Sequence, residues 1–462
     1  MESFEQLLLT IPDTRERLSS LFRYLLASEA QLMRQINAVN SGAQLPAPSA
    51  EEEGDLEFGL ILYWLRHPDE QHVDAVLANP AFSFATQALV NFAPQSSITE
   101  DMLSFLSGID YNTGFVAADG TLYTPGKYAQ LDLRWFFAAV NYVINLLDPD
   151  SIYQPFPMAP YHTTIPTEKK SITIAILGDW GTGPYDDEYA GQGPAVAVMN
   201  AIRNLKPDYV VHLGDVYYCG TDARHPVHEE LDNFLTQWNT GTDAKTCFTL
   251  NSNHEMYGAA QGLIGIALNH GTPFEHQNRT TYFGLEFGAW VILGLDSAYF
   301  DPSILYMKGA LGDAGNTQQR DFISKTFGNL KDKKVFLMTH HNAIKYDGSA
   351  TTPMWDSMLT TLGGNQPYAW YWGHLHLGAA YNAIPGSTTL GRCVGHSAIP
   401  FGNPSGLNST IAGYYAHTPL NIGTRQMQNG FATVTLGADG SYSEAFYEVD
   451  AQGRYSKPWS NP

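Results

Sequence analysis

The stretch Gly178-Asp179-Trp180-Gly181 directly follows an apolar run, Ile172 to Leu177. Three later polar motifs follow short apolar runs in the same way, and a fifth motif comes after them. These later motifs are Gly214-Asp215-Val216-Tyr217-Tyr218, Asn253-His254-Glu255, Thr339-His340-His341 and Gly373-His374-Leu375-His376. Runs of this length, rich in Val, Ile and Phe, are typical of buried strands. The motifs therefore mark strand ends, where sheet enzymes place their sites.

Together the motifs supply carboxylates, a phenol, an amide and several imidazoles. This mixture of hard oxygen and borderline nitrogen ligands suits a pair of transition metals, and it indicates two-metal hydrolytic chemistry. Taken singly, each motif has a structural alternative. Gly-Asp is often a turn, and the histidines of Gly-His-x-His could simply share one face of a strand. Five motifs in one order favour the functional interpretation.

The five motifs resemble the signature of the calcineurin-like metallophosphoesterases. That signature runs Asp, Gly-Asp, Gly-Asn-His-Glu/Asp, a strand-end His and Gly-His-x-His, in the order found here between about residues 170 and 450. The chain looks most similar to the purple acid phosphatases. Gly181 stands where most of the superfamily has His, and Tyr218 matches the Gly-Asp-x-x-Tyr pattern of that branch. One departure is Ser252, which occupies a position that is usually Gly.

The resemblance implies seven ligands for two divalent or trivalent metal ions. They are Asp179, Tyr218 and His376 for the first metal, Asn253, His340 and His374 for the second, and Asp215 as the bridge between them. A hard phenolate favours iron in the Tyr218 site, and the second ion is expected to be Fe, Zn or Mn. A metal-bound hydroxide would be the nucleophile. His254 is the candidate catalytic residue, as a general acid or as a cation that stabilises the phosphate.

The expected activity is hydrolysis of phosphate esters, and the purple acid phosphatase pattern favours monoesters. Two alternatives stay open: a phosphodiesterase that acts on a cyclic nucleotide or another diester, and a non-catalytic binding or regulatory protein on the same scaffold. A small phosphorylated molecule is the expected substrate. The formal net charge of −21 argues against nucleic acid and anionic membranes as partners.

Length and composition predict two domains, because 462 residues exceed what one core usually supports. Residues 1–165 carry 20 acidic and 7 basic side chains and are expected to form an acidic, mostly helical domain that ends in a Pro-rich connector. This region shows no catalytic motif, so we expect it to pack on the enzyme or to bind a protein partner, outside the chemistry. Residues 166–462 are expected to form the metallophosphoesterase catalytic domain that the resemblance implies. Its expected fold class is α/β, a four-layer α/β/β/α metallophosphoesterase sandwich.

No signal peptide or transmembrane segment is evident in the sequence. The apolar run Leu7-Leu8-Leu9 is too short for a signal peptide, and the stretch Trp135 to Leu147 is interrupted by Asn141. Three cysteines without a CxxC pair argue against a disulfide framework. These features predict a cytoplasmic location. Secretion stays open as the alternative, since purple acid phosphatases are often secreted.

Overall fold

The structure of the chain is a computed structural model. It describes residues 115–124, 126–130, 132, 135, 138, 141–142, 145, 160–186, 189, 191–221, 228–238, 246–313 and 315–462. Most of the helical domain expected for residues 1–165 lies outside these described residues.

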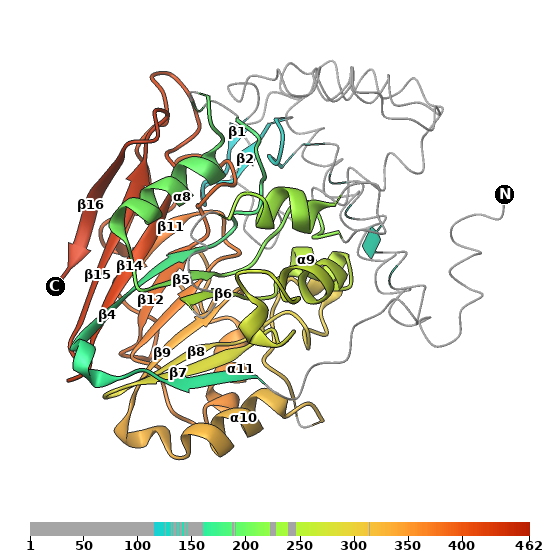
Figure 1. Cartoon of the computed structure of the whole chain (residues 1–462). Helices are drawn as coiled ribbons and strands as arrows, with labels where there is room; N and C mark the ends of the chain where they lie inside the picture. Colours follow the sequence, from blue (N-terminus) through green and yellow to red (C-terminus); the bar gives the residue numbers. More distant parts are fainter. Residues whose placement is uncertain are drawn as a thin grey trace.

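Two mixed β-sheets form the centre of the described region (Figure 1). In the larger sheet the strand order is β13-β11-β12-β10-β9-β8-β7-β3, and in the smaller sheet it is β16-β15-β14-β4-β5-β6. The larger sheet contains β3 (Tyr161–Thr164), β7 (Phe283–Phe287), β8 (Trp290–Gly294), β9 (Lys334–Thr339), β10 (Ala369–Trp372), β11 (Gly378–Tyr381), β12 (Leu390–Val394) and β13 (Ala412–Tyr415). The smaller contains β4 (Ser171–Leu177), β5 (Tyr209–His212), β6 (Cys247–Thr249), β14 (Gly430–Gly437), β15 (Tyr442–Val449) and β16 (Tyr455–Asn461). A separate hairpin pairs β1 (Phe115–Val116) with β2 (Leu122–Tyr123).

Alternate side chains of the central strands face two different layers. In β4, Ile172, Ile174 and Ile176 pack in the core between the two sheets. Ala175 and Leu177 of the same strand pack instead in the core on the other face of the sheet. Strand β8 alternates in the same way between the shared core and the outer face of the larger sheet. This period of two follows from strand geometry, and it requires a covering layer on each outer face.

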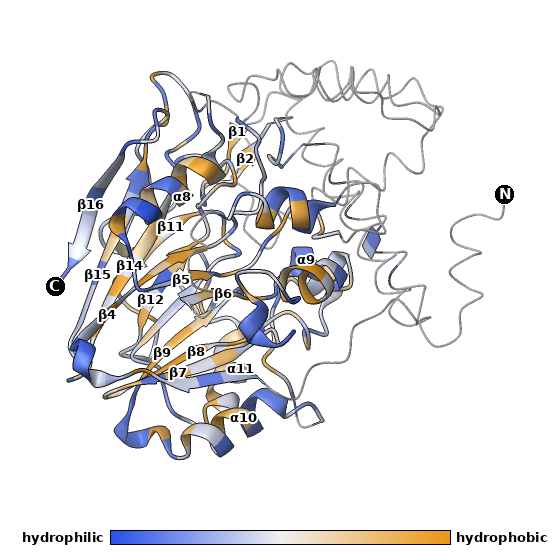
Figure 2. Cartoon of the chain, viewed as in Figure 1, coloured by the Kyte–Doolittle hydropathy of each residue, from blue (hydrophilic) through white to orange (hydrophobic). Residues whose placement is uncertain are grey.

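Helices supply these covering layers. Helix α8 (Pro194–Leu205) buries its apolar face in the core outside the smaller sheet, and helices α10 (Gln318–Phe327) and α11 (Pro353–Thr361) cover the larger sheet. Hydrophobic and hydrophilic residues alternate in colour along α8 and α10, as surface helices require (Figure 2). The expected four-layer α/β/β/α metallophosphoesterase fold is thus confirmed. Other helical elements are α9 (Asn253–Tyr257) and the short turns Thr167–Lys169, Glu230–Leu235, Leu263–Ala267, Glu275–Gln277, Ile304–Tyr306 and Leu330–Asp332. No helix among the described residues has the length and apolar character needed to cross a membrane.

Residues before position 165 contribute to this fold. Strand β3, which falls in the expected connector, pairs in parallel with β7 at the edge of the larger sheet. Farther upstream, Gly402 N donates a hydrogen bond to Gly120 O, and Gly406 N donates to Ala118 O. Strand pairing and loop packing therefore join residues on the two sides of the boundary expected at residue 165.

The turn after β5 depends on a glycine. Gly214 has φ +106°, and a Cβ at this position would lie 2.8 Å from Ser252 Cβ and 3.1 Å from His340 Nδ1. Gly364 also has positive φ, at +84°, but a Cβ there would have no neighbour within 4 Å. Both positions therefore need a positive φ, but only Gly214 is closely surrounded by other atoms.

We predict that Gly214→Ala lowers the free energy of unfolding by about 1–3 kcal/mol more than Gly364→Ala does, because both substitutions strain the backbone but only the first also overpacks the turn. Urea unfolding of the two variants measures this difference. Equal losses would show that the crowding around Gly214 does not hold in solution.

Candidate metal centre

The polar motifs lie where parallel strands of both sheets end. Strands β4, β5 and β6 run parallel, and so do β8, β9 and β10. Asp179 follows β4, Asp215 follows β5, and α9 begins with Asn253 after β6. The histidine motifs follow β9 and β10. The expectation that the motifs stand at strand ends is confirmed.

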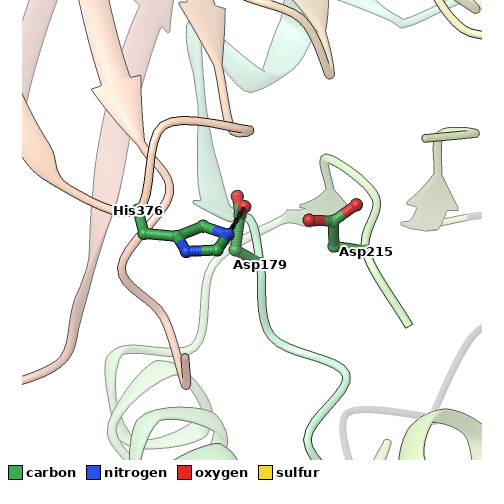
Figure 3. Close-up of side chains that lie close together, drawn as sticks. All are labelled: Asp179, Asp215 and His376. Atoms are coloured by element: carbon green, nitrogen blue, oxygen red, sulfur yellow. Dashed lines mark ion pairs between the residues drawn. The ribbon is translucent and has the colours of Figure 1, made fainter. Parts of the chain in front are cut away.

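One group of side chains consists of Asp179, Asp215 and His376. Each offers a ligand atom, and these atoms all lie within 4.8 Å of one another. His376 Nε2 is 3.5 Å from Asp179 Oδ1, and Figure 3 shows the ring edge pointing at that carboxylate, with Asp215 beyond it. Two buried carboxylates and an imidazole form a donor set suited to a transition-metal cation.

A second group gathers around the side-chain oxygen of Asn253. His340 Nε2 lies 2.9 Å and His374 Nδ1 3.2 Å from Asn253 Oδ1. The amide nitrogen of Asn253 donates to Tyr257 Oη at 3.0 Å, which turns the oxygen toward the two imidazoles. His340 Nε2 is also 3.2 Å from Asp215 Oδ1. Asp215 thus borders both groups.

The protonation of His340 shows why this second group fits a cation. Its Nδ1 lies 3.0 Å from the carbonyl oxygen of Leu213, which can only accept, so Nδ1 carries the proton. In the neutral ring, Nε2 then presents a lone pair toward Asn253 Oδ1 and Asp215 Oδ1. Asp215 Oδ1 is buried and has no hydrogen-bond partner among the described residues. Acceptors that converge without a proton repel one another unless a cation lies between them.

Burial prepares the imidazoles of the site for metal binding. It lowers the pKa of His374 to about 3 and that of His376 to about 4, and it holds the pKa of His340 well below its usual range. These rings are therefore neutral near pH 7, as metal ligands must be. Burial also raises the pKa of Asp179 well above its usual range, and the charge of Asp215 raises it further. A bound cation would reverse this effect.

Three residues of the site have left-handed backbone conformations. Asp179 has φ +56°, Asp215 has φ +78° and His374 has φ +65°. Residues other than glycine rarely adopt such angles, and conformations of this kind gather at functional sites. All three follow a glycine at a strand end, so the chain is turned sharply to point these side chains at one another.

The phenol beside the carboxylates belongs to Tyr217. Its hydroxyl donates to Asp215 Oδ2 at 2.9 Å and lies 3.4 Å from both Asp179 Oδ1 and His376 Nε2. The hydroxyl of Tyr218 donates instead to Asp132 Oδ2 at 2.5 Å. Tyr218 as a metal ligand therefore stays a prediction, and the structure brings its neighbour to the site. Sequence reasoning passed over Tyr217 because the family spacing selects the second tyrosine.

His254 stands next to the carboxylates, with its ring fixed by the backbone. Its Nδ1 lies 2.8 Å from the carbonyl oxygen of Tyr218, so Nδ1 donates and Nε2 is directed toward Asp215 Oδ2, 3.9 Å away. The backbone nitrogen of His254 donates to Ser252 Oγ, which caps α9. Ser252 has φ −137°, an ordinary extended value, so this position does not need glycine.

Glu255 holds the turn that carries Asp215. Its carboxylate oxygens accept the backbone N–H of Asp215 at 3.1 and 3.2 Å. Glu255 is part of the third motif, but nothing in its spacing identified this contact. The ring of His341 packs against that of His374, with centroids 4.7 Å apart, but its two nitrogens lie against Ser297 Oγ and the carbonyl oxygen of Tyr306.

Comparison with known proteins agrees with this arrangement. Residues 172–378 match the calcineurin-like phosphoesterase family, and the matched range contains every motif residue from Asp179 to His376. This match, which covers less than half of the chain, supports a relation of the matched region to the metallophosphoesterase superfamily. Among 14 matching chains of solved structures is one described as "GAP50 the anchor in the inner membrane complex of Plasmodium". It has 12% identity and a TM-score of 0.42, and the match covers 63% of this chain and 88% of that one. No curated protein matches the sequence.

The two tyrosines can be distinguished by spectroscopy. In protein loaded with ferric ion, coordination of a phenolate gives a visible absorption band. We predict that Tyr217→Phe removes this band and that Tyr218→Phe keeps it, because the hydroxyl of Tyr217 faces Asp215 whereas that of Tyr218 donates to Asp132. Loss of the band in Tyr218→Phe alone would restore the ligand expected from the sequence and contradict the placement of Tyr217.

Proposed function

We propose that the protein hydrolyses small phosphate monoesters at a centre of two metal ions, as purple acid phosphatases do. The observation that carries this proposal is the position of Asp215. Its Oδ1 faces His340, and its Oδ2 accepts the hydroxyl of Tyr217, so one buried carboxylate borders both groups of donors. The match to calcineurin-like phosphoesterases supports the same chemistry.

The two groups define which residues would hold each ion. Asp179, His376 and a tyrosine would hold the first, Asn253, His340 and His374 the second, and Asp215 both. A phenolate ligand favours Fe in the first position, with Fe, Zn or Mn in the second. When bound, such a pair polarises the phosphoryl group and lowers the pKa of water.

His254 would supply the proton for the leaving group. Because its Nδ1–H is committed to the carbonyl of Tyr218, the exchangeable proton of an imidazolium would be the one on Nε2, which is directed toward the carboxylates. The side chain reaches the site without belonging to either donor group. These features fit a general acid better than a ligand.

The complete set of donors favours catalysis over a purely binding role. Asp215 Oδ1 is a buried oxygen without a hydrogen-bond partner among the described residues, and such an oxygen lowers the stability of the fold. A scaffold protein without turnover would gain nothing from keeping acceptors converged on it. A phosphodiesterase would use the same donors. A panel of monoesters and diesters therefore distinguishes the proposed activity from this alternative.

We predict that the purified protein binds about two transition-metal ions per chain and that chelation abolishes hydrolysis of nitrophenyl phosphate. Asp215→Asn should lose metal and lower kcat by at least about 10³-fold, because both donor groups share this residue. Asp208→Asn is the matched control, because Asp208 lies just before β5 and Asp215 just after it. Metal analysis and steady-state kinetics of the same preparations measure both effects. Undiminished hydrolysis by fully metal-free protein would refute the proposal.

His254→Ala is predicted to keep both metals and to lower kcat by about 10² to 10⁴-fold toward esters with poor leaving groups, the range typical for loss of a general acid. Metal content must be measured beside kcat. Release of metal from this variant would identify His254 as a ligand instead, and unchanged turnover would exclude it from the chemistry.

A further inference from the structure

A segment that precedes the family-matched region packs directly against the metal centre. Tyr128, Trp135 and Tyr142 share one buried cluster with Tyr217 and Tyr218. The described positions 135, 138, 142 and 145 are helical, and their spacing of three or four residues places them on one face. This segment therefore forms a wall beside the metal centre, in a region where the sequence shows no catalytic motif.

Tyr218 is the residue that joins this wall to the centre. Its ring stacks on Tyr128, with 4.8 Å between centroids, and meets Trp135 edge-on at 4.7 Å. Its hydroxyl donates to Asp132 Oδ2, a buried carboxylate that also accepts the backbone N–H of Tyr128 at 2.7 Å. The backbone N–H of Tyr218 donates to Glu229 Oε1 at 2.6 Å. Ring, hydroxyl and backbone of Tyr218 are thus all held.

The carbonyl of this fixed residue orients His254. Because Tyr218 O accepts from His254 Nδ1, the position of this carbonyl constrains the direction of Nε2. Trp135 packs on the imidazole as well, with ring centroids 5.2 Å apart. The wall therefore holds His254 in two ways. It fixes Tyr218, whose carbonyl accepts from His254 Nδ1, and Trp135 contacts the imidazole directly.

The same wall also supports helix α9, which carries Asn253 and His254. Asn145 Nδ2 donates to the carbonyl oxygen of Tyr257 at 2.8 Å, and Tyr142 meets the ring of Tyr257 edge-on. Tyr257 in turn accepts from the amide of Asn253. Contacts from residues 128–145 thus reach both functional side chains of this helix.

We propose that Asp132, acting through Tyr218, and Trp135 are positioning residues that hold His254 for proton donation to the leaving group. This inference rests on the proposed hydrolysis and deepens it. As an oxygen of water forms a bond to phosphorus and the P–O bond to the leaving group breaks, the leaving oxygen takes the proton from His254 Nε2, and the neutral ring regains a proton released by that water. Without the Asp132–Tyr218 bond the ring samples other orientations, and the proton reaches the oxygen less often.

The test uses the full-length, metal-loaded protein and a series of phosphate monoesters, from an activated dinitrophenyl ester to phenyl and alkyl esters. Activated leaving groups need little help from an acid, whereas alkoxides need much. We expect Asp132→Ala and Tyr218→Phe to lower kcat for the alkyl ester about 10-fold or more beyond any loss for the dinitrophenyl ester. Asp132→Asn retains an acceptor oxygen and should recover most of the difference.

Tyr414 and Glu448 provide matched controls. Tyr414 Oη donates to Glu448 Oε1 at 2.8 Å, so this pair is also a buried phenol and carboxylate, but it lies between β13 and β15. Tyr414→Phe and Glu448→Ala should leave the dependence on the leaving group unchanged. If Asp132→Ala does not fold, Tyr218→Phe removes the same hydrogen bond while retaining the ring.

A second readout does not depend on turnover. Nitrogen-15 shifts of the His254 ring, assigned with His254→Gln, should show a proton fixed on Nδ1 in the parent protein and exchange between the two nitrogens in Asp132→Ala. Equal kinetic losses across the ester series, an unchanged His254 spectrum, or release of metal from Tyr218→Phe would each overturn the inference. If the parent protein hydrolyses no ester, the proposed function fails, while the nitrogen shifts still test the positioning of His254.

Discussion

The buried carboxylate of Asp215 is the constraint on which the rest of the site depends. An anion with an unpartnered oxygen is costly in a protein interior, and the groups around it offer that oxygen no proton. The side chains around Asp215 point into the same volume. They are imidazoles that burial keeps neutral, the amide oxygen of Asn253 and the carboxylate of Asp179. A bound cation would satisfy this set of donors. The fold therefore presents an arrangement suited to metal binding.

The two sheets make this arrangement possible because their parallel strands end together. The inter-sheet core fixes β4 and β5 against β9 and β10, so the turns that follow them are brought close although they lie up to about 200 residues apart in sequence. The left-handed backbone of Asp179, Asp215 and His374 turns each side chain inward. Rigid strands carry the donors, and short strained turns aim them.

Much of this candidate site could be predicted from the sequence, because each candidate aspartate or histidine ligand lies one to four residues after the end of a strand. Position in the chain then determines position in space. The choice between Tyr217 and Tyr218 could not be made in this way, because neighbouring tyrosines carry the same group and only the local backbone decides which hydroxyl faces Asp215. The contacts of Asp132 and Trp135 with the site could not be predicted from the sequence either. Both residues meet the site across more than 80 residues of sequence, and such a contact leaves no periodic pattern.

The most direct test of the account is a crystal structure of the metal-loaded protein with anomalous differences recorded at the absorption edge of the metal. Two peaks are expected roughly 3.5 to 4 Å apart, one on each side of the Asp215 carboxylate, with the phenol of Tyr217 beside the peak that Asp179 and His376 share. A single peak away from Asp215, or none in protein of full metal content, would contradict it.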